Sequence, residues 1–312
     1  MVRPEPIPTR HASAAGFTPD QLRSKRWATP FHGVRVDRNA TGDLRTIYTA
    51  LAAVARVPVI VSDRSAAARY RWWLPLRIDS DVDISVAPGN FIERVGVRCH
   101  RRAIDPKDVR HLDGIALTSP VRTILDLASQ LPLIDLVIVM DAALHMRTCT
   151  LAELVARAQD RGVRGIVRFR RAVLLCDGRS ESPMETIMRL LFVLSGLPAP
   201  TPQFKVYDMY GALVARTDLR APGVRAAFEY DGGGHDEPVV HARDVKRWRD
   251  LRNAGYEVFP YTASDLFGTP QQIVVDYQRA LGLPIDAGAV KGWLDEWKHS
   301  GFNRQARPPR HP

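Results

Sequence analysis

The sequence predicts an α/β protein of the α+β type, built from successive regions of different pattern. Residues 1–40 have the pattern of short helices and a strand, and residues 41–178 mix helices and strands. Residues 179–285 follow the order helix, strand, strand, helix, strand, helix. Residues 286–312 add a C-terminal helix and a Pro- and Arg-rich basic tail, which we expect to be disordered from residue 300 onward.

Composition excludes several classes of protein. Hydrophobic residues make up 45% of the 312 residues, which is enough for packed cores and argues against wholesale disorder. The apolar runs are too short to span a bilayer, and the N-terminus lacks the apolar stretch of a signal peptide. Cys99, Cys149 and Cys176 form neither a disulfide framework nor a CxxC metal site. We therefore expect a cytoplasmic protein with no membrane segment.

The charge balance is compatible with a polyanionic partner. The formal net charge is +10, and arginine, which binds phosphate in a bidentate manner, outnumbers lysine. Nucleic acid is the commonest partner of such a chain. The alternative is that a GC-rich genome enriches arginine without any ligand.

The first region has the element order of a winged helix-turn-helix. Residues 11–16 predict a short helix ended by glycine, and Thr18 begins a second helix as N-cap, with Pro19 at its first position and Gln21 at the capping-box position. A strand is expected over residues 31–36. The basic second helix, carrying the three cations Arg23, Lys25 and Arg26, would face the major groove of DNA. The alternative is a helical hairpin with a solvated basic face.

The middle region shows elements but no catalytic spacing. Residues 59–61 and 82–86 predict strands, Ser65 begins a helix, and Ser119 caps another. We interpret the basic run at residues 98–102 as a solvated strand face.

The third region contains the stretch EYDGGGH (229–235), in which two acids and a histidine surround three glycines. A turn signal at residues 221–223 predicts a two-residue loop that pairs residue 218 with residue 227. Asp218 then shares a strand face with Glu229 and Asp231 and lies diagonal to Glu229. A four-residue loop gives the same parity, whereas a three-residue loop separates the acids.

Carboxylates gathered on one face repel each other unless a cation or a proton relieves them. The pattern therefore predicts a metal site at Asp218 and Glu229. Because its ligands are oxygens, Mg²⁺ or Mn²⁺ is expected rather than Zn²⁺.

Three further side chains have both a functional and a structural interpretation. Glu185 is either a fourth acid of the site or the capping-box partner of Ser182, and the two roles are compatible. His235 either activates water or is an exposed loop histidine. Arg247 either clamps a phosphate or pairs with Asp244 on its own helix.

Residues from about 180 to 266 resemble the very-short-patch-repair (Vsr)-like nucleases of the PD-(D/E)XK restriction-endonuclease superfamily. The matching pieces, in order, are residues 180–185, Arg216–Leu219, Phe228–Gly232 with His235, and Asp244, Arg247, Leu251, Gly255 and Tyr256. The likeness covers a little over a quarter of the chain.

This resemblance implies a mixed sheet flanked by helices and metal-dependent phosphodiester cleavage. It makes Asp218 and Glu229 metal ligands, with Asp231 and His235 assisting the ligands or the water and Glu185 supporting them. The chain departs from the superfamily pattern where Asp231 replaces a lysine, which shifts the general base toward His235. Pro260 also stands where members of the group often carry arginine.

A second, weaker resemblance links residues 11–36 to the winged-helix region of AbiE-type (type IV) antitoxins, in which this region binds promoter DNA. Residues 65–67 and 118–127 are similar to the middle region of actinobacterial proteins that join such a head to a Vsr-like tail.

Together these features predict a DNA-binding protein with a magnesium-dependent endonuclease domain, linked to toxin–antitoxin function, phage defence or DNA repair. The alternative is a non-catalytic, antitoxin-like transcriptional regulator with a degenerate nuclease fold. RNA is a third possible substrate. DNA and a cognate toxin are the expected partners, and the sequence leaves the oligomeric state open.

Overall fold

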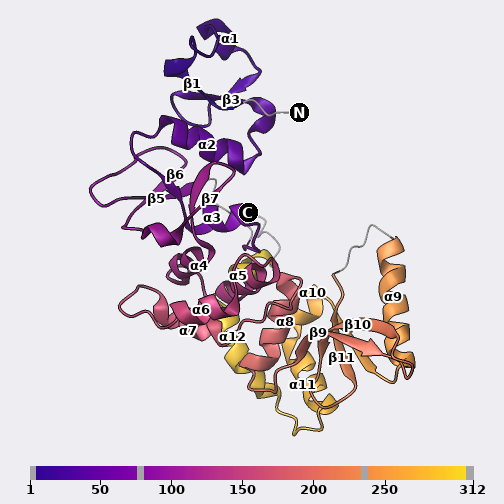
Figure 1. The fold of residues 1–312 in the computed structure, drawn as a ribbon. Coiled ribbons are helices and arrows are strands. Elements are labelled where there is room, and N and C mark those ends of the chain that lie inside the picture. The colour runs from indigo at the N-terminus through magenta and orange to yellow at the C-terminus, as the bar shows by residue number, and fades with distance from the viewer. Residues whose placement is uncertain (1–4, 76–80, 233–237, 307–312) are drawn as a thin grey trace, which may run out of the picture. The chain divides into compact units, whose positions relative to one another are not determined.

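We describe a computed structural model of the chain, in which residues 5–75, 81–232 and 238–306 are described. The chain divides into two compact units, residues 1–127 and residues 128–312 (Figure 1). Helices and strands alternate in both units, which confirms the predicted α+β class. The finer boundaries after residues 40, 178 and 285 stay predictions.

The first unit begins with a small antiparallel sheet and a capped helix. The sheet has the order β1-β3-β2, formed by β1 (Ile7–Pro8), β2 (Trp27–Ala28) and β3 (Val34–Asp37). Helix α1 (Pro19–Arg23) carries the predicted capping box. The Thr18 N–H donates to Gln21 Oε1 (2.7 Å), and the Gln21 N–H donates to Thr18 Oγ1 (3.3 Å).

Two predictions about this region are wrong. In place of an α-helix over residues 11–16 there is the 3₁₀ turn η1 (Thr9–His11), followed by turns up to Gly16 with φ of +78°. Helix α1 ends at Arg23, so Lys25 and Arg26 follow the helix instead of forming its basic face.

The rest of the first unit is a five-stranded mixed sheet in the order β6-β5-β4-β8-β7. Its strands are β4 (Ile60–Val61), β5 (Val82–Val86), β6 (Val97–Arg101), β7 (Val109–Leu112) and β8 (Ile115–Thr118). Its helical elements are η2 (Arg38–Ala40), α2 (Leu44–Val54), α3 (Asp63–Arg69), η3 (Pro106–Asp108) and α4 (Pro120–Ala128). The predicted strands are confirmed, but α3 begins at Asp63 and not at Ser65, because Ser62 occupies the N-cap position.

A buried helix dominates the start of the second unit. Helix α5 (Leu133–His145) has eleven buried residues in a row, from Leu133 to Ala143. It packs against α7 and α8. The other helical elements of this unit, apart from those beside its sheet, are α6 (Leu151–Arg157), α7 (Ile166–Val173), α8 (Pro183–Leu194), α10 (Ala263–Gly268), η4 (Ala287–Val290), α12 (Lys291–Trp297) and α13 (Gly301–Ala306). Because α13 is helical, the expectation of disorder from residue 300 onward is wrong for residues 301–306.

The second unit also contains a four-stranded mixed sheet in the order β12-β11-β10-β9. Strands β9 (Thr201–Tyr207), β10 (Leu213–Arg220) and β11 (Ala226–Tyr230) are antiparallel, and β12 (Glu257–Tyr261) runs parallel to β11. Strand β9 was not predicted. Gly255 ends the helix before β12 with φ of +79°, as expected.

Helices flank both faces of this sheet (Figure 1). On one face, Phe228 of β11 contacts the rings of Phe192 in α8 and Tyr277 in α11 (Pro270–Ala280), at centroid distances of 5.3 and 5.0 Å. On the other face, Ala227 packs with Leu251 of α9 (Pro238–Asn253). The mixed sheet flanked by helices is therefore confirmed. No described helix combines the length and apolarity needed to cross a bilayer.

Candidate functional site

The register of β10 and β11 places Asp218 directly opposite Glu229. Leu219 pairs with Phe228 and Arg220 with Ala227, and the Ala221 N–H donates to the Ala226 carbonyl (3.0 Å). The connecting loop therefore has four residues, 222–225, and not the two expected. The parity is unchanged, so the acids still share a face, but they are direct cross-strand neighbours and not diagonal ones.

Backbone donors hold both carboxylates in place. The Asp218 N–H donates to Glu229 Oε1 (3.1 Å), and the Tyr230 N–H donates to Asp218 Oδ2 (2.9 Å). Each carboxylate thus accepts a hydrogen bond from a backbone N–H of these strands. The two side chains lie against the strands, locked by the same register that brings them together.

Burial makes this pair electrostatically unusual. Glu229 is fully buried, whereas Asp218 is half-buried. Burial and the negative charge of Asp218 together raise the pKa of Glu229 to about 7, against the opposing effect of the Arg247 guanidinium. A carboxyl group of this kind near neutral pH is typical of functional sites, although ion-pair networks also produce it.

Arg247 of α9 provides the positive charge. Its Nη2 lies 3.0 Å from Glu229 Oε2, an oxygen that is buried and, among the described residues, lacks a well-aligned hydrogen bond. The sequence suggested a phosphate or Asp244 as the partner of Arg247. The structure brings it to Glu229 instead, and the side chain of Asp244 lies outside the described residues.

Asp231 and His235 complete the predicted set. Asp231 follows β11 and is half-buried, and its N–H donates to the Tyr261 carbonyl (2.8 Å), which extends the pairing with β12. His235 and the glycines before it, Gly233 and Gly234, lie outside the described residues. Within the described part of the chain, no group of three or more His, Cys, Asp or Glu side chains is arranged to hold a metal. Mg²⁺ commonly uses only one or two protein carboxylates together with water and substrate phosphate, so the Asp218–Glu229 pair remains a suitable donor set.

Glu185 takes part in capping the N-terminus of α8. Its carboxylate accepts hydrogen bonds from the Glu181 N–H (2.9 Å), Ser182 Oγ (3.0 Å) and Gln203 Nε2 (2.7 Å), while Ser182 Oγ accepts from the Glu185 N–H (3.2 Å). Burial raises its pKa, and the hydrogen bond from Glu181 opposes the shift. Its capping role is present, with Glu181 in place of Ser182 as the backbone donor, and its role in the acidic site stays a prediction.

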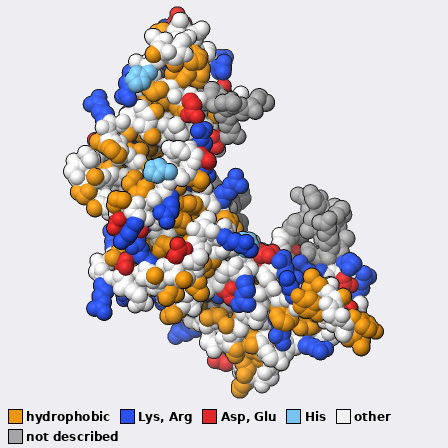
Figure 2. All heavy atoms as spheres, viewed as in Figure 1, with side chains coloured by type: hydrophobic (Ala, Val, Ile, Leu, Met, Phe, Trp, Pro, Cys, Tyr) orange, Lys and Arg blue, Asp and Glu red, His pale blue; other side chains and the backbone are white. Residues whose placement is uncertain are grey.

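The predicted DNA-contacting cations of the first unit are exposed. The Arg23 side chain is 71% exposed and pairs with Asp20, and Lys25 is also exposed. Arg26 lies 3.3 Å from Asp37 and stacks over the ring of Trp27 at 5.1 Å. Figure 2 shows Lys and Arg side chains spread over the whole visible face, so charge alone does not mark an interface.

A buried ionic cluster in the first unit was missed. Asp63 and Asp83 are buried, and both face basic side chains in and just after β6. His100 Nε2 lies 3.0 Å from Asp83 Oδ1 and 3.7 Å from Asp63 Oδ2, Arg98 lies 3.4 Å from Asp83, and Arg102 donates to Asp63. The interpretation of the basic run as a solvated face is therefore wrong for Arg98, His100 and Arg102, which contact buried carboxylates, whereas Arg101 is exposed.

The sequence did contain a signal for this cluster. Asp83 and Ser85 alternate with apolar residues in β5, and Arg98, His100 and Arg102 alternate in and just after β6. The parallel register pairs Asp83 with Arg98 and Ser85 with His100, so two polar alternations meet on one face.

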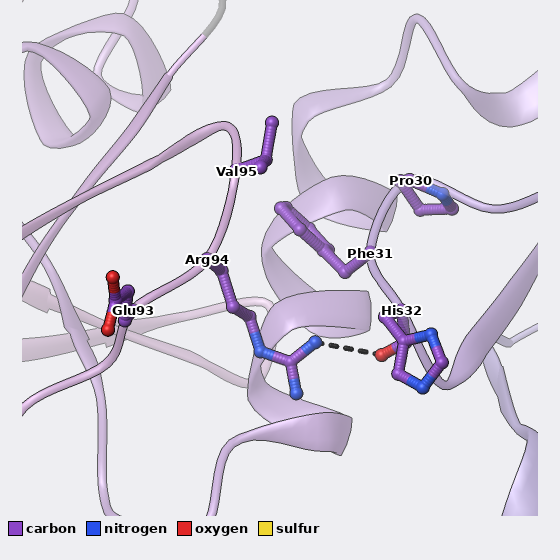
Figure 3. A pocket seen from close by; sticks show the side chains of 6 residues that line it. All are labelled: Pro30, Phe31, His32, Glu93, Arg94 and Val95. Atoms are coloured by element: carbon purple, nitrogen blue, oxygen red, sulfur yellow. Dashed lines mark hydrogen bonds between the residues drawn. The ribbon is translucent and has the colours of Figure 1, made fainter.

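The first unit also has a surface hollow of about 450 Å³ between two loops, residues 30–32 and 93–95. Figure 3 shows Arg94 crossing it, with its Nη1 donating to the His32 carbonyl at 2.8 Å. None of the predicted site residues lines this hollow.

Comparison with known proteins identifies relatives for most of the chain. Residues 63–175 match the family described as AbiEi antitoxin C-terminal domain. Two proteins of Mycobacterium tuberculosis, uncharacterized protein Rv2248 of strain H37Rv and uncharacterized protein MT2308 of strain CDC 1551, are each 32% identical over 196 residues. The alignment covers 62% of this chain and 71% of each relative. No solved structure matches the chain.

The antitoxin match falls within the region that the sequence assigned to an antitoxin-like middle part, so that resemblance is confirmed. The Vsr-like resemblance farther along the chain stays a prediction. The chain belongs to the same family as the two mycobacterial proteins, and it carries an AbiEi antitoxin C-terminal domain match over residues 63–175.

Proposed function

We propose that this chain is a DNA-binding protein of a toxin–antitoxin system, with a cognate toxin as its functional partner. The observation that carries the proposal is the match of residues 63–175 to the AbiEi antitoxin C-terminal domain. The head that precedes this region would bind duplex DNA and regulate transcription.

The geometry of the head supports this role. The capping box fixes the start of α1, and Arg23, Lys25 and Arg26 lie on it or just after it with exposed side chains. Arginine and lysine at such positions contact phosphates, which orient a protein on the duplex and make its affinity depend on salt. The net charge of +10 favours the same partner.

A mobility-shift titration with a fragment of the chain's own promoter tests this proposal. The triple variant Arg23→Ala, Lys25→Ala, Arg26→Ala should bind more weakly, and the slope of log K against log salt should fall by up to about three, because each lost phosphate contact removes ~0.9. The matched control is Arg56→Ala, Lys107→Ala, Arg161→Ala, which removes three exposed cations elsewhere. Equal slopes for the two triple variants would show that the head does not bind the DNA.

A second candidate function is a magnesium-dependent endonuclease in residues 179–285. One observation favours it: Asp218 and Glu229 face each other on adjacent strands of a mixed sheet flanked by helices, which is the architecture that the Vsr-like resemblance implies. Asp218 and Glu229 would hold the cation, and Asp231 and His235 would position the attacking water and take its proton. When bound, Mg²⁺ or Mn²⁺ supplies Lewis-acid polarisation of the scissile phosphate.

Supercoiled plasmid provides the test of this second function. Nicking in the presence of Mg²⁺ should disappear in Asp218→Asn and in Glu229→Gln and persist in the triple head variant. The endonuclease is refuted if the plasmid stays supercoiled with wild-type protein in both Mg²⁺ and Mn²⁺ while the promoter fragment is still shifted. The DNA-binding regulator would then be the one function that remains.

A further inference from the structure

The hairpin that joins β9 to β10 ends in an exposed, apolar tip. Four large hydrophobic side chains are exposed there: Tyr207 by 54%, Met209 by 88%, Tyr210 by 86% and Leu213 by 57%. Leu213 lies opposite Tyr207 in the sheet register, and the other two lie in the turn between them, so the four form one patch, which we call the hairpin tip. A contiguous apolar patch of this kind is uncommon on a monomeric protein and marks an interaction surface.

Asp208 fixes the shape of this turn. Its Oδ1 accepts hydrogen bonds from the Tyr210 N–H and the Ala212 N–H, both at 2.8 Å. The Asp208 N–H donates to the Ala212 carbonyl (2.9 Å), and the Gly211 N–H donates to the Asp208 carbonyl (3.1 Å). Gly211 has the positive φ, +82°, that the turn requires. A preorganised surface loses little conformational entropy on binding, so the hairpin tip is well suited to contact a partner.

The charges around the hairpin tip do not suit DNA. Asp208 is the one charged residue in the stretch 206–215, and its carboxylate is used by the turn. The basic residues that come next along the strands, Lys205 and Arg216, lie opposite each other, and Arg216 is held by Glu181 through two hydrogen bonds of 2.6 and 2.7 Å. Binding to a phosphate backbone depends on free cations. An uncharged apolar surface therefore fits the hairpin tip better than a nucleic acid or a highly charged protein.

Pairing of another strand with the edge of this sheet is disfavoured. Strand β9 stands at one end of the strand order, where a further strand could be added. Pro202 lacks an N–H, and Gln203 has a φ of +53°, which interrupts the extended backbone. Lys205 adds an exposed charge to the same strand. A partner is therefore expected on the side chains of the hairpin tip and not on the backbone of β9.

We propose that the hairpin tip binds a second copy of this chain, with the two tips packed against each other across a twofold axis. A twofold contact joins the same patch on both copies, so the patch has to be complementary to itself. An apolar tip whose one acid is already hydrogen-bonded meets this requirement without opposing like charges.

The exposed area of the tip sets the strength of this dimer. With about 200 Å² for a whole tyrosine side chain, the exposed fractions of the four residues give roughly 500 Å² per copy. The total of about 1,000 Å² lies at the lower limit for specific protein interfaces. The dimer should therefore be reversible, with a Kd in the micromolar range.

This inference depends neither on DNA binding nor on the second candidate function, and salt separates it from both. Protein–DNA affinity falls as salt rises, because counterions are released on binding. Two copies of a chain with a net charge of +10 repel each other, and salt screens this repulsion while the apolar contact remains. The dimer should therefore become tighter at high salt, whereas the complex with DNA becomes weaker.

Sedimentation velocity of the full-length protein tests the proposal. Wild type should show a monomer–dimer equilibrium between about 1 and 200 µM protein. The double variant Met209→Ser, Tyr210→Ser should dimerise at least about tenfold more weakly, because central aromatic side chains carry most of the affinity of an interface. Leu174→Ser is the matched control, since Leu174 has the same exposed fraction as Tyr210, 86%, and lies outside the hairpin; its Kd should change by less than about twofold.

Chemical crosslinking locates the contact independently. Tyr210→Cys should give a covalent dimer with a short bismaleimide reagent, because the two tips meet at the twofold axis. Leu174→Cys should give no more crosslinked dimer than wild type, whose own cysteines set the background.

Several results would overturn the inference. A wild-type protein that stays monomeric over this range of concentration would assign the tip to a different partner. That partner is DNA if the double variant also loses affinity for the promoter fragment. Equal dimerisation by wild type and the double variant, or an equal loss in Leu174→Ser, would place the contact elsewhere. Thermal melting verifies that each variant is folded.

Discussion

The second unit contains two buried carboxylate–arginine pairs that differ in how completely each carboxylate is satisfied. Asp141 of α5 is fully buried, and its Oδ2 lies 2.7 Å from Arg189 Nη2 of α8. Glu229 of β11 is also fully buried, and its Oε2 lies 3.0 Å from Arg247 Nη2 of α9. Both pairs join a buried acid to a helix that packs beside it.

The surroundings of the two acids differ. Asp141 also accepts hydrogen bonds from the Asp177 N–H (2.6 Å) and from Thr186 Oγ1 (2.8 Å), so both of its oxygens are used. Glu229 is served by the Asp218 N–H, the Thr217 hydroxyl and Arg247, and it faces a second carboxylate. The pKa of Asp141 is raised to about 6 and that of Glu229 to about 7, in both cases mainly by burial. The next largest influence on Asp141 is Arg189, which lowers its pKa. The next largest influence on Glu229 is Asp218, which raises its pKa.

We interpret the Asp141 pair as structural and the Glu229 pair as part of the proposed cation site. At Asp141 one acid meets one arginine that is only 5% exposed, and the network is complete without a ligand. At Glu229 the arginine contacts an acid that faces a second carboxylate, and the arginine side chain is 32% exposed. Carboxylates that face each other in this way are the kind of pair that a cation can bridge.

The largest expected effect is on stability. Arg189→Ala should lower the free energy of unfolding by ~3–5 kcal/mol, because it leaves Asp141 buried without its cation and also removes the bond from Arg189 to the Leu175 carbonyl (2.7 Å). Arg247→Ala should cost ~1–2 kcal/mol, since Glu229 can take up a proton near neutral pH. Urea denaturation followed by far-UV circular dichroism measures both. Equal losses of unfolding free energy in Arg189→Ala and Arg247→Ala would mean that the two carboxylate–arginine pairs do not differ in this way.

The pH dependence of stability should reveal the raised pKa of Glu229. A carboxyl group whose folded pKa is raised binds protons more tightly when folded, so its stabilising contribution is present at low pH and is lost as the pH rises through the folded pKa. For Glu229 the window runs from about 4.5 to about 7, and the upper bound of the change is about 3 kcal/mol.

Glu229→Gln should therefore show a flatter dependence of unfolding free energy on pH over this window than wild type. Asp141 contributes in the same direction in both proteins, so its effect cancels in the difference. Parallel curves for wild type and Glu229→Gln would mean that Glu229 does not titrate abnormally.

The smallest of the three effects concerns a single donor. Thr186→Val keeps the shape of the side chain and removes one hydrogen bond to Asp141, which should cost ~1–2 kcal/mol. Arg179→Ala is the control, because that exposed arginine pairs, among the described residues, with the neighbouring Asp177 and should change stability by less than about 0.5 kcal/mol. An effect of Thr186→Val as small as that of the control would mean that the Asp141 network does not depend on each donor.

The sequence predicted the acid pair because parity along strands survives an error in loop length. A loop of two or four residues puts Asp218 and Glu229 on one face. The prediction of a shared face therefore held although the loop, residues 222–225, is two residues longer than expected. The capping interactions at Thr18 and Ser182 were also predictable, because they involve residues three positions apart.

The partners of the buried acids could not be predicted in the same way. Asp141 and Arg189 are 48 positions apart and lie on different helices, so their contact depends on how α5 and α8 pack. The contact of Arg247 with Glu229 depends on the rotation of α9 about its axis, which no local pattern fixes. Helical spacing alone favoured Asp244, a neighbour on the same helix.

The most direct test of the distinction is a crystal structure of the full-length protein grown with MnCl₂, with anomalous scattering used to locate manganese. We predict a peak between the carboxylates of Asp218 and Glu229, with no peak at Asp141. A map that shows no manganese at Asp218 and Glu229 would contradict the assignment of this pair as a cation-binding site.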